Sequence, residues 1–312
     1  MTKSNQGQQA HHITGLYTAL VTPYEDNQVD YGRLEHLVEM QIDAGVDGIV
    51  PMGSTGEAAT ASEKEHMDVV KFVVDQVGGR THVMAGAGSN STDEAIRYSV
   101  AAAEAGADSL LSVTPYYNKP QQRGLVAHYT AVADSVDIPV VLYNIPGRSV
   151  VQIATDTILE LSQHPNIVGV KDASSDFKSM EKVIANTPSN FSVLSGNDDE
   201  TLKIIALGGQ GAIAVTSNIL PAQMKMYVDL CMHASNSKNL SDWRTPLDMQ
   251  YAFRNLFADL FIETNPVPVK DLMAYAGLCN ADVRLPLVGL EDKNHDQLIQ
   301  TFDVTKRRLG LG

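Results

Sequence analysis

Short apolar runs recur along the whole chain, and their spacing constrains the fold more than any other feature. Each run holds five to seven residues, is rich in Val, Ile and Leu, and lacks a regular polar alternation. This pattern is typical of parallel strands that are buried on both faces. The runs lie at intervals of roughly 20–35 residues, the size of a βα unit. The eight runs are Leu16–Thr22, Gly48–Met52, His82–Gly86, Ser109–Val113, Pro139–Tyr143, Ile167–Lys171, Phe191–Ser195 and Gly211–Val215.

Helical signals fill the intervals between these runs. Ser62 and Glu65 have capping-box spacing at the start of a helical segment over 63–76. Ser91 and Glu94 repeat the same spacing before the next predicted strand. We therefore expect each strand to be followed by a helix.

Eight βα units in one chain favour a (β/α)8 TIM barrel over an open, doubly wound sheet. No GxGxxG sequence follows the first run, and no GxxxxGK[ST] sequence occurs, so neither nucleotide-binding motif supports the open sheet. After Pro221 the strand pattern stops, yet roughly 90 residues remain, more than one helix of average length needs. We predict a catalytic barrel over 14–234 and a C-terminal extension of about three helices over 235–312.

Charge and composition narrow the classes of partner. The chain has 23 Lys and Arg against 37 Asp and Glu, a net charge of -14, which disfavours nucleic acid and anionic membranes as partners. No apolar stretch approaches the ~18 residues that a membrane span needs. The polar start of the chain resembles no signal peptide, so we expect a cytoplasmic protein. Cys231 and Cys279 are too few for a disulfide framework and are predicted to be buried thiols. The histidines form no metal-binding motif, and we expect neither a metal nor a dissociable cofactor.

Polar residues with reactive side chains follow several of the predicted strands. Because the carboxyl ends of all eight strands meet at one rim of such a barrel, where active sites form, we expect these side chains to converge. The segments concerned are Gly53–Glu57, Thr114–Asn118, Tyr143–Arg148, Lys171–Asp172 and Ser195–Asp198.

Lys171 ends an apolar run, so burial is expected to lower the pKa of its amine. A neutral amine attacks a ketone and forms a Schiff base, whose iminium accepts electrons from the neighbouring carbon. Tyr143, on the adjacent strand, is a candidate proton shuttle for that step, with Ser54 and Tyr117 as relay members. Taken alone, a lysine at a strand end is more often a surface residue or the ion-pair partner of a neighbour such as Asp172.

Each of the other candidates also has a structural alternative. The glycines and hydroxyls of Gly53–Gly56 suit an anion-binding turn, but also an ordinary βα turn. Arg148 follows a Pro-Gly turn and could clamp a carboxylate, although a surface arginine is the commoner case. Of Tyr116 and Tyr117, one of the two adjacent tyrosines is expected to pack.

Seven sequence segments, in this order, resemble the dihydrodipicolinate synthase / N-acetylneuraminate lyase family. The resemblance covers essentially the whole chain after residue 14. It implies a (β/α)8 barrel that acts as a class I aldolase through a pyruvate Schiff base. The segments are GSTGE (53–57), VTPYYNKP (113–120), LYNIPGRS (142–149), IVGVKDAS (167–174), LSGND (194–198), GAIAVTSN (211–218) and ETNPVPVK (263–270).

The resemblance implies a role for four catalytic residues. Lys171 would be the Schiff-base lysine and Tyr143 the general acid and base. Ser54 and Tyr117 would complete the proton relay, with Tyr117 reaching in from a neighbouring subunit. This role requires at least a dimer, and the family implies a homotetramer.

The resemblance also implies which residues bind the substrates. The backbone N–H groups of Ser54 and Thr55 would hold the carboxylate of pyruvate, and Gly196 and Ile213 would line the pyruvate pocket. Arg148 would bind the carboxylate of the second substrate.

Arg148, TPYYN and NPVPVK favour the synthases within this family, and therefore L-aspartate 4-semialdehyde as the second substrate. Ser54-Thr55 stands where the synthases usually have Thr-Thr, and Ser-Thr is common among the lyases. The alternatives are N-acetylneuraminate lyase and the 2-keto-3-deoxy sugar acid aldolases.

Some synthases of this family are inhibited by lysine at a subunit interface. Glu63 stands where sensitive members have His or an aromatic residue, so we expect this chain to be insensitive. The matching positions are Ala58, Glu63, His66, Asn90, Glu94 and Tyr116.

Overall fold

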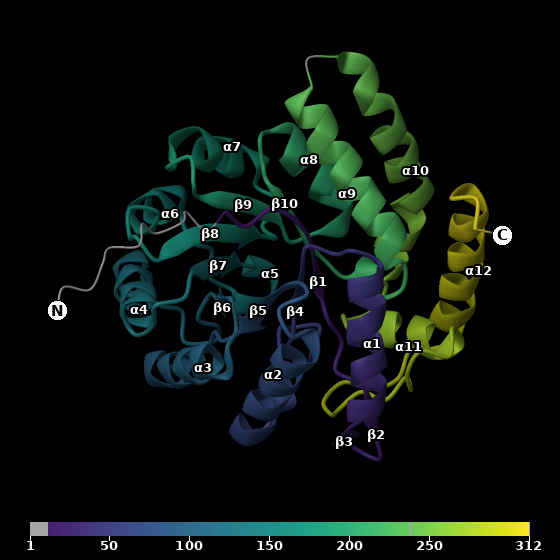
Figure 1. Cartoon of the computed structure of the whole chain (residues 1–312), viewed down its shortest axis with the longest axis horizontal. Coiled ribbons are helices and arrows are strands. Elements are labelled where there is room, and N and C mark those ends of the chain that lie inside the picture. Colours follow the sequence, from purple (N-terminus) through teal and green to yellow (C-terminus); the bar gives the residue numbers. More distant parts are fainter. Residues whose placement is uncertain (1–11, 238, 312) are drawn as a thin grey trace.

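Eight parallel strands form the centre of the molecule and close into a barrel (Figure 1). The computed structural model describes residues 12–237 and 239–311. The strands follow one another around the barrel in chain order, and β1 closes the ring by pairing with both β4 and β10. All eight predicted strands are present, which confirms the (β/α)8 barrel. They are β1 (Gly15–Ala19), β4 (Gly48–Val50), β5 (His82–Gly86), β6 (Ser109–Val113), β7 (Val140–Asn144), β8 (Ile167–Asp172), β9 (Ser192–Ser195) and β10 (Gly211–Ala214).

Both faces of these strands are buried, which explains their continuous apolar sequence. Successive side chains alternate between the barrel interior and the layer beneath the helices. In β7, Val141 belongs to the inner cluster, whereas Val140 and Leu142 belong to the cluster that packs against the helices.

Helices surround the strands, as the βα spacing predicts (Figure 1). The hydroxyls of Ser62 and Ser91 accept hydrogen bonds from the amides of Glu65 (3.2 Å) and Glu94 (3.4 Å), so both predicted caps form. The two glutamates bind Arg284 and Ser89 instead of their own caps. The barrel helices are α1 (Tyr31–Asp43), α2 (Glu63–Val77), α3 (Thr92–Ala105), α4 (Gln122–Asp134), α6 (Thr155–Leu161), α7 (Phe177–Asn186), α8 (Thr201–Ala206) and α9 (Pro221–Asn236).

Three further helices follow the barrel and lie to one side of it (Figure 1). They are α10 (Arg244–Asp259), α11 (Val267–Tyr275) and α12 (Asp292–Arg308), and α10 packs against both α9 and α12. Three helices agree with the expected extension, and within the described residues no strand follows Ala214. The division into two domains at 234/235 stays a prediction.

A short hairpin of β2 (Tyr24–Glu25) and β3 (Gln28–Val29) was not predicted from the sequence. Its strands have two residues each, too few for an alternating pattern to show. Asp26 and Asn27 form the turn with positive φ angles of 49° and 64°, a conformation that Asp and Asn tolerate well.

Cys231 and Cys279 are both buried and free, as predicted. Among the described residues, no helix combines the length and the hydropathy that a membrane crossing requires.

Candidate active site

Lys171 and Tyr143 lie side by side at the carboxyl ends of β8 and β7. They are direct register partners between the two strands, and each is only 5% exposed. The Lys171 Nζ atom lies 4.2 Å from the centre of the Tyr143 ring. Lys171 forms no ion pair with any described residue, so neither structural alternative for it holds: it is not a surface lysine and it does not pair with Asp172.

The carboxylate of Asp172 is bound on the outer side of the rim. It accepts hydrogen bonds from the Asn144 side-chain amide (2.7 Å) and from the hydroxyl and amide of Ser174 (2.7 and 3.1 Å). Because Asn144 and Asp172 follow Tyr143 and Lys171 directly, their bond holds β7 and β8 together at the level of the reactive pair. Burial raises the pKa of Asp172, and these hydrogen bonds oppose the shift.

Gly196 and Ile213, the residues predicted to line a pyruvate pocket, lie near the same pair. Ile213 is fully buried and belongs to the inner cluster that contains Tyr143 and Leu194. The amide of Gly196 donates to the Asp172 carbonyl at 2.6 Å. A Cβ atom at position 196 would lie 2.9 Å from that oxygen, so only glycine allows this close approach.

Asp198 is a buried carboxylate in the loop that follows β9. It accepts hydrogen bonds from the Thr216 hydroxyl (2.6 Å) and from the amides of Thr216 (2.7 Å) and Val215 (3.1 Å). Burial raises the pKa of Asp198, while these bonds and the positive charge of Lys171 lower it. Asp198 thus ties the β9 loop to the end of β10.

The turn over 53–57 follows β4 and carries Ser54 and Thr55 at the same rim of the barrel. The Thr22 hydroxyl donates to the Gly56 carbonyl at 2.7 Å and holds the turn from β1. Within the described ranges, the amides of Ser54 and Thr55 donate to no protein acceptor. Two adjacent free N–H groups beside hydroxyls make a local site for an anion.

Asn265, between α10 and α11, joins this turn to Arg148. Its side-chain amide donates to the Thr55 hydroxyl oxygen at 2.9 Å, and its main-chain carbonyl accepts from Arg148 Nη2 at 2.8 Å. Arg148 lies in the short helix α5 (Pro146–Ser149), and its side chain remains exposed. The C-terminal extension therefore contacts two of the predicted binding residues through one side chain and one carbonyl.

A buried ion pair holds the same turn at its end. Lys270 Nζ lies 2.6 Å from Glu57 Oε1, and the second oxygen of Glu57 accepts the Arg284 amide at 3.0 Å. The Tyr24 ring contacts both cations: its centre lies 4.2 Å from Lys270 Nζ and 4.1 Å from the guanidinium carbon of Arg284. Burial lowers the pKa of Lys270, against the attraction of Glu57.

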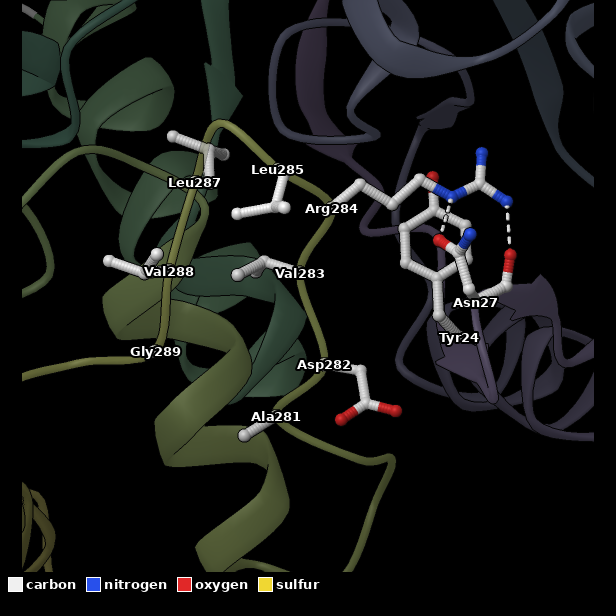
Figure 2. A pocket seen from close by; sticks show the side chains of 10 residues that line it. All are labelled: Tyr24, Asn27, Ala281, Asp282, Val283, Arg284, Leu285, Leu287, Val288 and Gly289. Atoms are coloured by element: carbon white, nitrogen blue, oxygen red, sulfur yellow. Dashed lines mark hydrogen bonds between the residues drawn. The ribbon is translucent and has the colours of Figure 1, made fainter.

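A cavity of about 450 Å³ opens beside this cluster, between the β2–β3 hairpin and the segment 281–289 (Figure 2). The Arg284 guanidinium reaches across to Asn27 and donates to its side chain (3.1 Å) and to its carbonyl (2.7 Å) (Figure 2). None of the eight residues predicted for the active site lines this cavity.

Tyr117 is not enclosed by its own chain. Its side chain is 87% exposed, and its backbone has a positive φ of 72°. Tyr116 is 37% exposed, and its carbonyl accepts a hydrogen bond from Asn90 at 3.1 Å. Both tyrosines are therefore exposed on this chain, and the expectation that one of them packs is not met within the described residues.

Several of the positions matched to lysine binding already have partners. Arg97 binds Glu63 through Nε (3.1 Å) and Nη2 (3.3 Å). The Ser89 hydroxyl donates to Glu94, and His66 stacks on Tyr98 with ring centres 4.3 Å apart. Burial lowers the pKa of His66.

Sequence reasoning named Lys171, Tyr143, Ser54, Thr55 and Arg148, and the structure brings them to one rim. It assigned no role to the residues that brace them: Thr22, Asn144, Asp198, Asn265 and Lys270. The motif NPVPVK contains two of these residues, but an Asn before Pro in a C-terminal segment predicts only a turn.

Together, the barrel and its carboxyl rim define this chain as a (β/α)8-barrel enzyme. The model of the dihydrodipicolinate synthetase family matches residues 12–304. The chain belongs to this family.

Relatives with assigned names agree with this placement. A 4-hydroxy-tetrahydrodipicolinate synthase from Endomicrobium trichonymphae is 42% identical over 287 residues, which are 92% of this chain and 96% of the relative. One from Syntrophus aciditrophicus (strain SB) is 46% identical over 284 residues, 91% of this chain and 95% of the relative. The structure of the synthase from the methanotroph Methylacidiphilum fumariolicum SolV superposes with a TM-score of 0.92 at 40% identity, covering 96% of this chain and 97% of the other.

Proposed function

We propose that this chain condenses pyruvate with L-aspartate 4-semialdehyde and forms 4-hydroxy-tetrahydrodipicolinate, a step toward diaminopimelate and lysine. The observation that carries the proposal is the buried Lys171, which has no ion-pair partner among the described residues and lies beside Tyr143 at the rim of the barrel. The two curated relatives described above are named for this activity, and this chain aligns with 96% and 95% of their lengths.

The first half of the reaction activates pyruvate. The neutral amine of Lys171 adds to the C2 carbonyl, and Tyr143 transfers the protons that turn the carbinolamine hydroxyl into leaving water. The resulting iminium draws electrons from the methyl carbon, which loses a proton and becomes an enamine. Ser54 and Tyr117 connect Tyr143 to further hydroxyls, so that it can both accept and return a proton.

The second half forms the new carbon–carbon bond. The enamine carbon attacks the aldehyde carbon of the semialdehyde, and the aldehyde oxygen takes up a proton. The amine of the second substrate then attacks the iminium carbon, which closes the ring and releases Lys171 as the free amine.

Two groups of the rim bind the carboxylates. The free amides of Ser54 and Thr55, with the Thr55 hydroxyl, hold the carboxylate of pyruvate, and Gly196 and Ile213 bound the space for its methyl group. Arg148 binds the carboxylate of the semialdehyde, because an exposed guanidinium beside the rim can donate two parallel hydrogen bonds to a carboxylate.

The proposal includes an assembly. An 87% exposed Tyr117 suits a residue that completes the site of a neighbouring subunit, and we place this chain in a homotetramer in the cytoplasm. The barrel over 14–234 carries the chemistry, and the extension over 235–312 supports its rim.

The test is turnover of pyruvate and L-aspartate 4-semialdehyde, coupled to a dihydrodipicolinate reductase and followed as loss of NADPH. We expect turnover that is lost in Lys171→Ala, together with borohydride trapping of pyruvate on Lys171 in the unmutated protein. If the protein traps pyruvate but does not turn over the semialdehyde, the assignment of L-aspartate 4-semialdehyde as the second substrate is wrong. If the protein traps no pyruvate, the proposed Schiff base between Lys171 and pyruvate is wrong.

A further inference from the structure

We propose that Asn265 is a positioning residue that serves both carboxylate-binding groups through two separate atoms. Its side-chain amide fixes the Thr55 hydroxyl as a donor toward pyruvate, and its main-chain carbonyl anchors Arg148 for the second substrate. This inference rests on the proposed function and adds to it a residue from the C-terminal extension.

The geometry places Asn265 between the two groups. It is 5% exposed, and it contacts Thr55 at 2.9 Å and Arg148 at 2.8 Å, although these residues are 210 and 117 positions away in the chain. The segment is held next to the 53–57 turn a second time, by the buried ion pair between Lys270 and Glu57. Two independent contacts therefore set the distance between this segment and the turn.

The direction of the hydrogen bond gives Asn265 its effect on Thr55. A threonine hydroxyl has one hydrogen to donate and lone pairs to accept with. The Asn265 amide occupies a lone pair, and among the described residues the Thr55 hydroxyl donates to no other group. Its hydrogen is thereby left for a ligand oxygen, and its oxygen is fixed in space.

The effect on Arg148 passes through the main chain. Arg148 is exposed, and its long side chain would otherwise sample many rotamers. The bond to the Asn265 carbonyl holds the guanidinium on the side of the rim where Thr55 lies. Truncation of the Asn265 side chain leaves this carbonyl in place, so the two effects can be separated by mutation.

The first experiment is steady-state kinetics of Asn265→Ala. We expect the KM for pyruvate to rise about tenfold, as for the loss of one hydrogen bond, and the KM for the semialdehyde to stay within about twofold, because the carbonyl that anchors Arg148 remains. Equal rises in both KM values, or a lowered Tm with both KM values unchanged, would show that Asn265 only supports the fold.

A double-mutant cycle with Thr55→Val tests the route of the effect. If Asn265 acts through the Thr55 hydroxyl, Asn265→Ala adds nothing to the pyruvate KM of Thr55→Val. Effects that multiply in the double variant would overturn the proposal. Asn166→Ala is the matched control: Asn166 donates to the Ala133, Val136 and Ile138 carbonyls at 2.9–3.0 Å near the start of β8, so its loss should lower Tm without changing either KM.

Asn265→Asp keeps the shape of the side chain and covers the case in which Asn265→Ala does not fold. A carboxylate cannot donate, so the Thr55 hydroxyl would have to donate to it and would lose its hydrogen for pyruvate. An unchanged pyruvate KM in this variant would overturn the proposal. Borohydride trapping requires only pyruvate. Its rate therefore reports the effects of these variants on pyruvate binding even if the semialdehyde is not the second substrate. A failure of the unmutated protein to trap pyruvate would be a failure of the proposed function itself.

Discussion

The ammonium group of Lys171 lies 4.2 Å above the ring of Tyr143, its register partner on the next strand. This contact separates two contributions of Tyr143, because the ring stabilises the cation and the hydroxyl moves protons. Tyr143→Phe keeps the first and removes the second. We expect it to lower turnover and the trapping rate about 10²- to 10⁴-fold, with little change in Tm.

Tyr227→Phe is the control for that variant, since it also removes a buried hydroxyl, one that donates to Gln250 on α10. It should leave the trapping rate unchanged. A Tyr143→Phe protein that traps pyruvate at the original rate would show that another group shuttles the proton.

Arg148→Lys retains the charge and loses the planar fork and the geometry of the bond to the Asn265 carbonyl. We expect the KM for the semialdehyde to rise roughly 10- to 100-fold, while pyruvate trapping stays the same. Arg254→Lys changes an exposed arginine on α10 and should alter neither. Slower pyruvate trapping in Arg148→Lys would show that Arg148 binds pyruvate and not the semialdehyde.

Lys270→Met leaves the Glu57 carboxylate buried without its cation. The two side chains are 0% and 2% exposed, so we expect a loss of about 3–5 kcal/mol in the free energy of unfolding, measured with urea. The double variant Glu57→Gln/Lys270→Met should recover part of the lost free energy of unfolding, because no unpaired carboxylate remains. Lys64→Met, which breaks an exposed pair with Asp68, should cause no measurable change.

His128 makes stability depend on pH. Burial lowers its pKa from 6.5 to about 4, so between these values the unfolded chain binds a proton that the folded chain does not. Stability therefore falls as the pH drops from 6.5 to 4, by about 3 kcal/mol from this group. We expect denaturant unfolding of His128→Gln to show a shallower decline than the unmutated protein. Parallel declines would contradict this origin.

Added lysine should not inhibit the enzyme. Glu63 is already bound by Arg97, and Glu94 by Ser89, at two of the positions that the resemblance matches to lysine binding. The measurement is turnover at saturating and at limiting pyruvate with increasing lysine. Inhibition that disappears in Glu94→Gln would show that the site operates despite Glu63.

The prediction that Lys171 and Tyr143 lie side by side was met for a physical reason. Parallel strands of a barrel all end on one rim, so residues at the ends of the apolar runs must meet there, and Lys171 and Tyr143 could be placed together from the sequence alone. The β2–β3 hairpin and the side-chain roles of Glu65 and Glu94 could not be foreseen. Two-residue strands leave no periodicity, and a capping glutamate binds whichever donor the fold brings nearest.

What the sequence determined by itself is the barrel, its order of elements and the set of groups on its rim, because these depend on local periodicity and on the ends of strands. Only the tertiary structure decided which residues hold that set in position. Asn265 and Lys270 reach Thr55 and Glu57 across more than 200 residues of chain. Such contacts depend on how α11 packs against the barrel, and no local pattern records that packing.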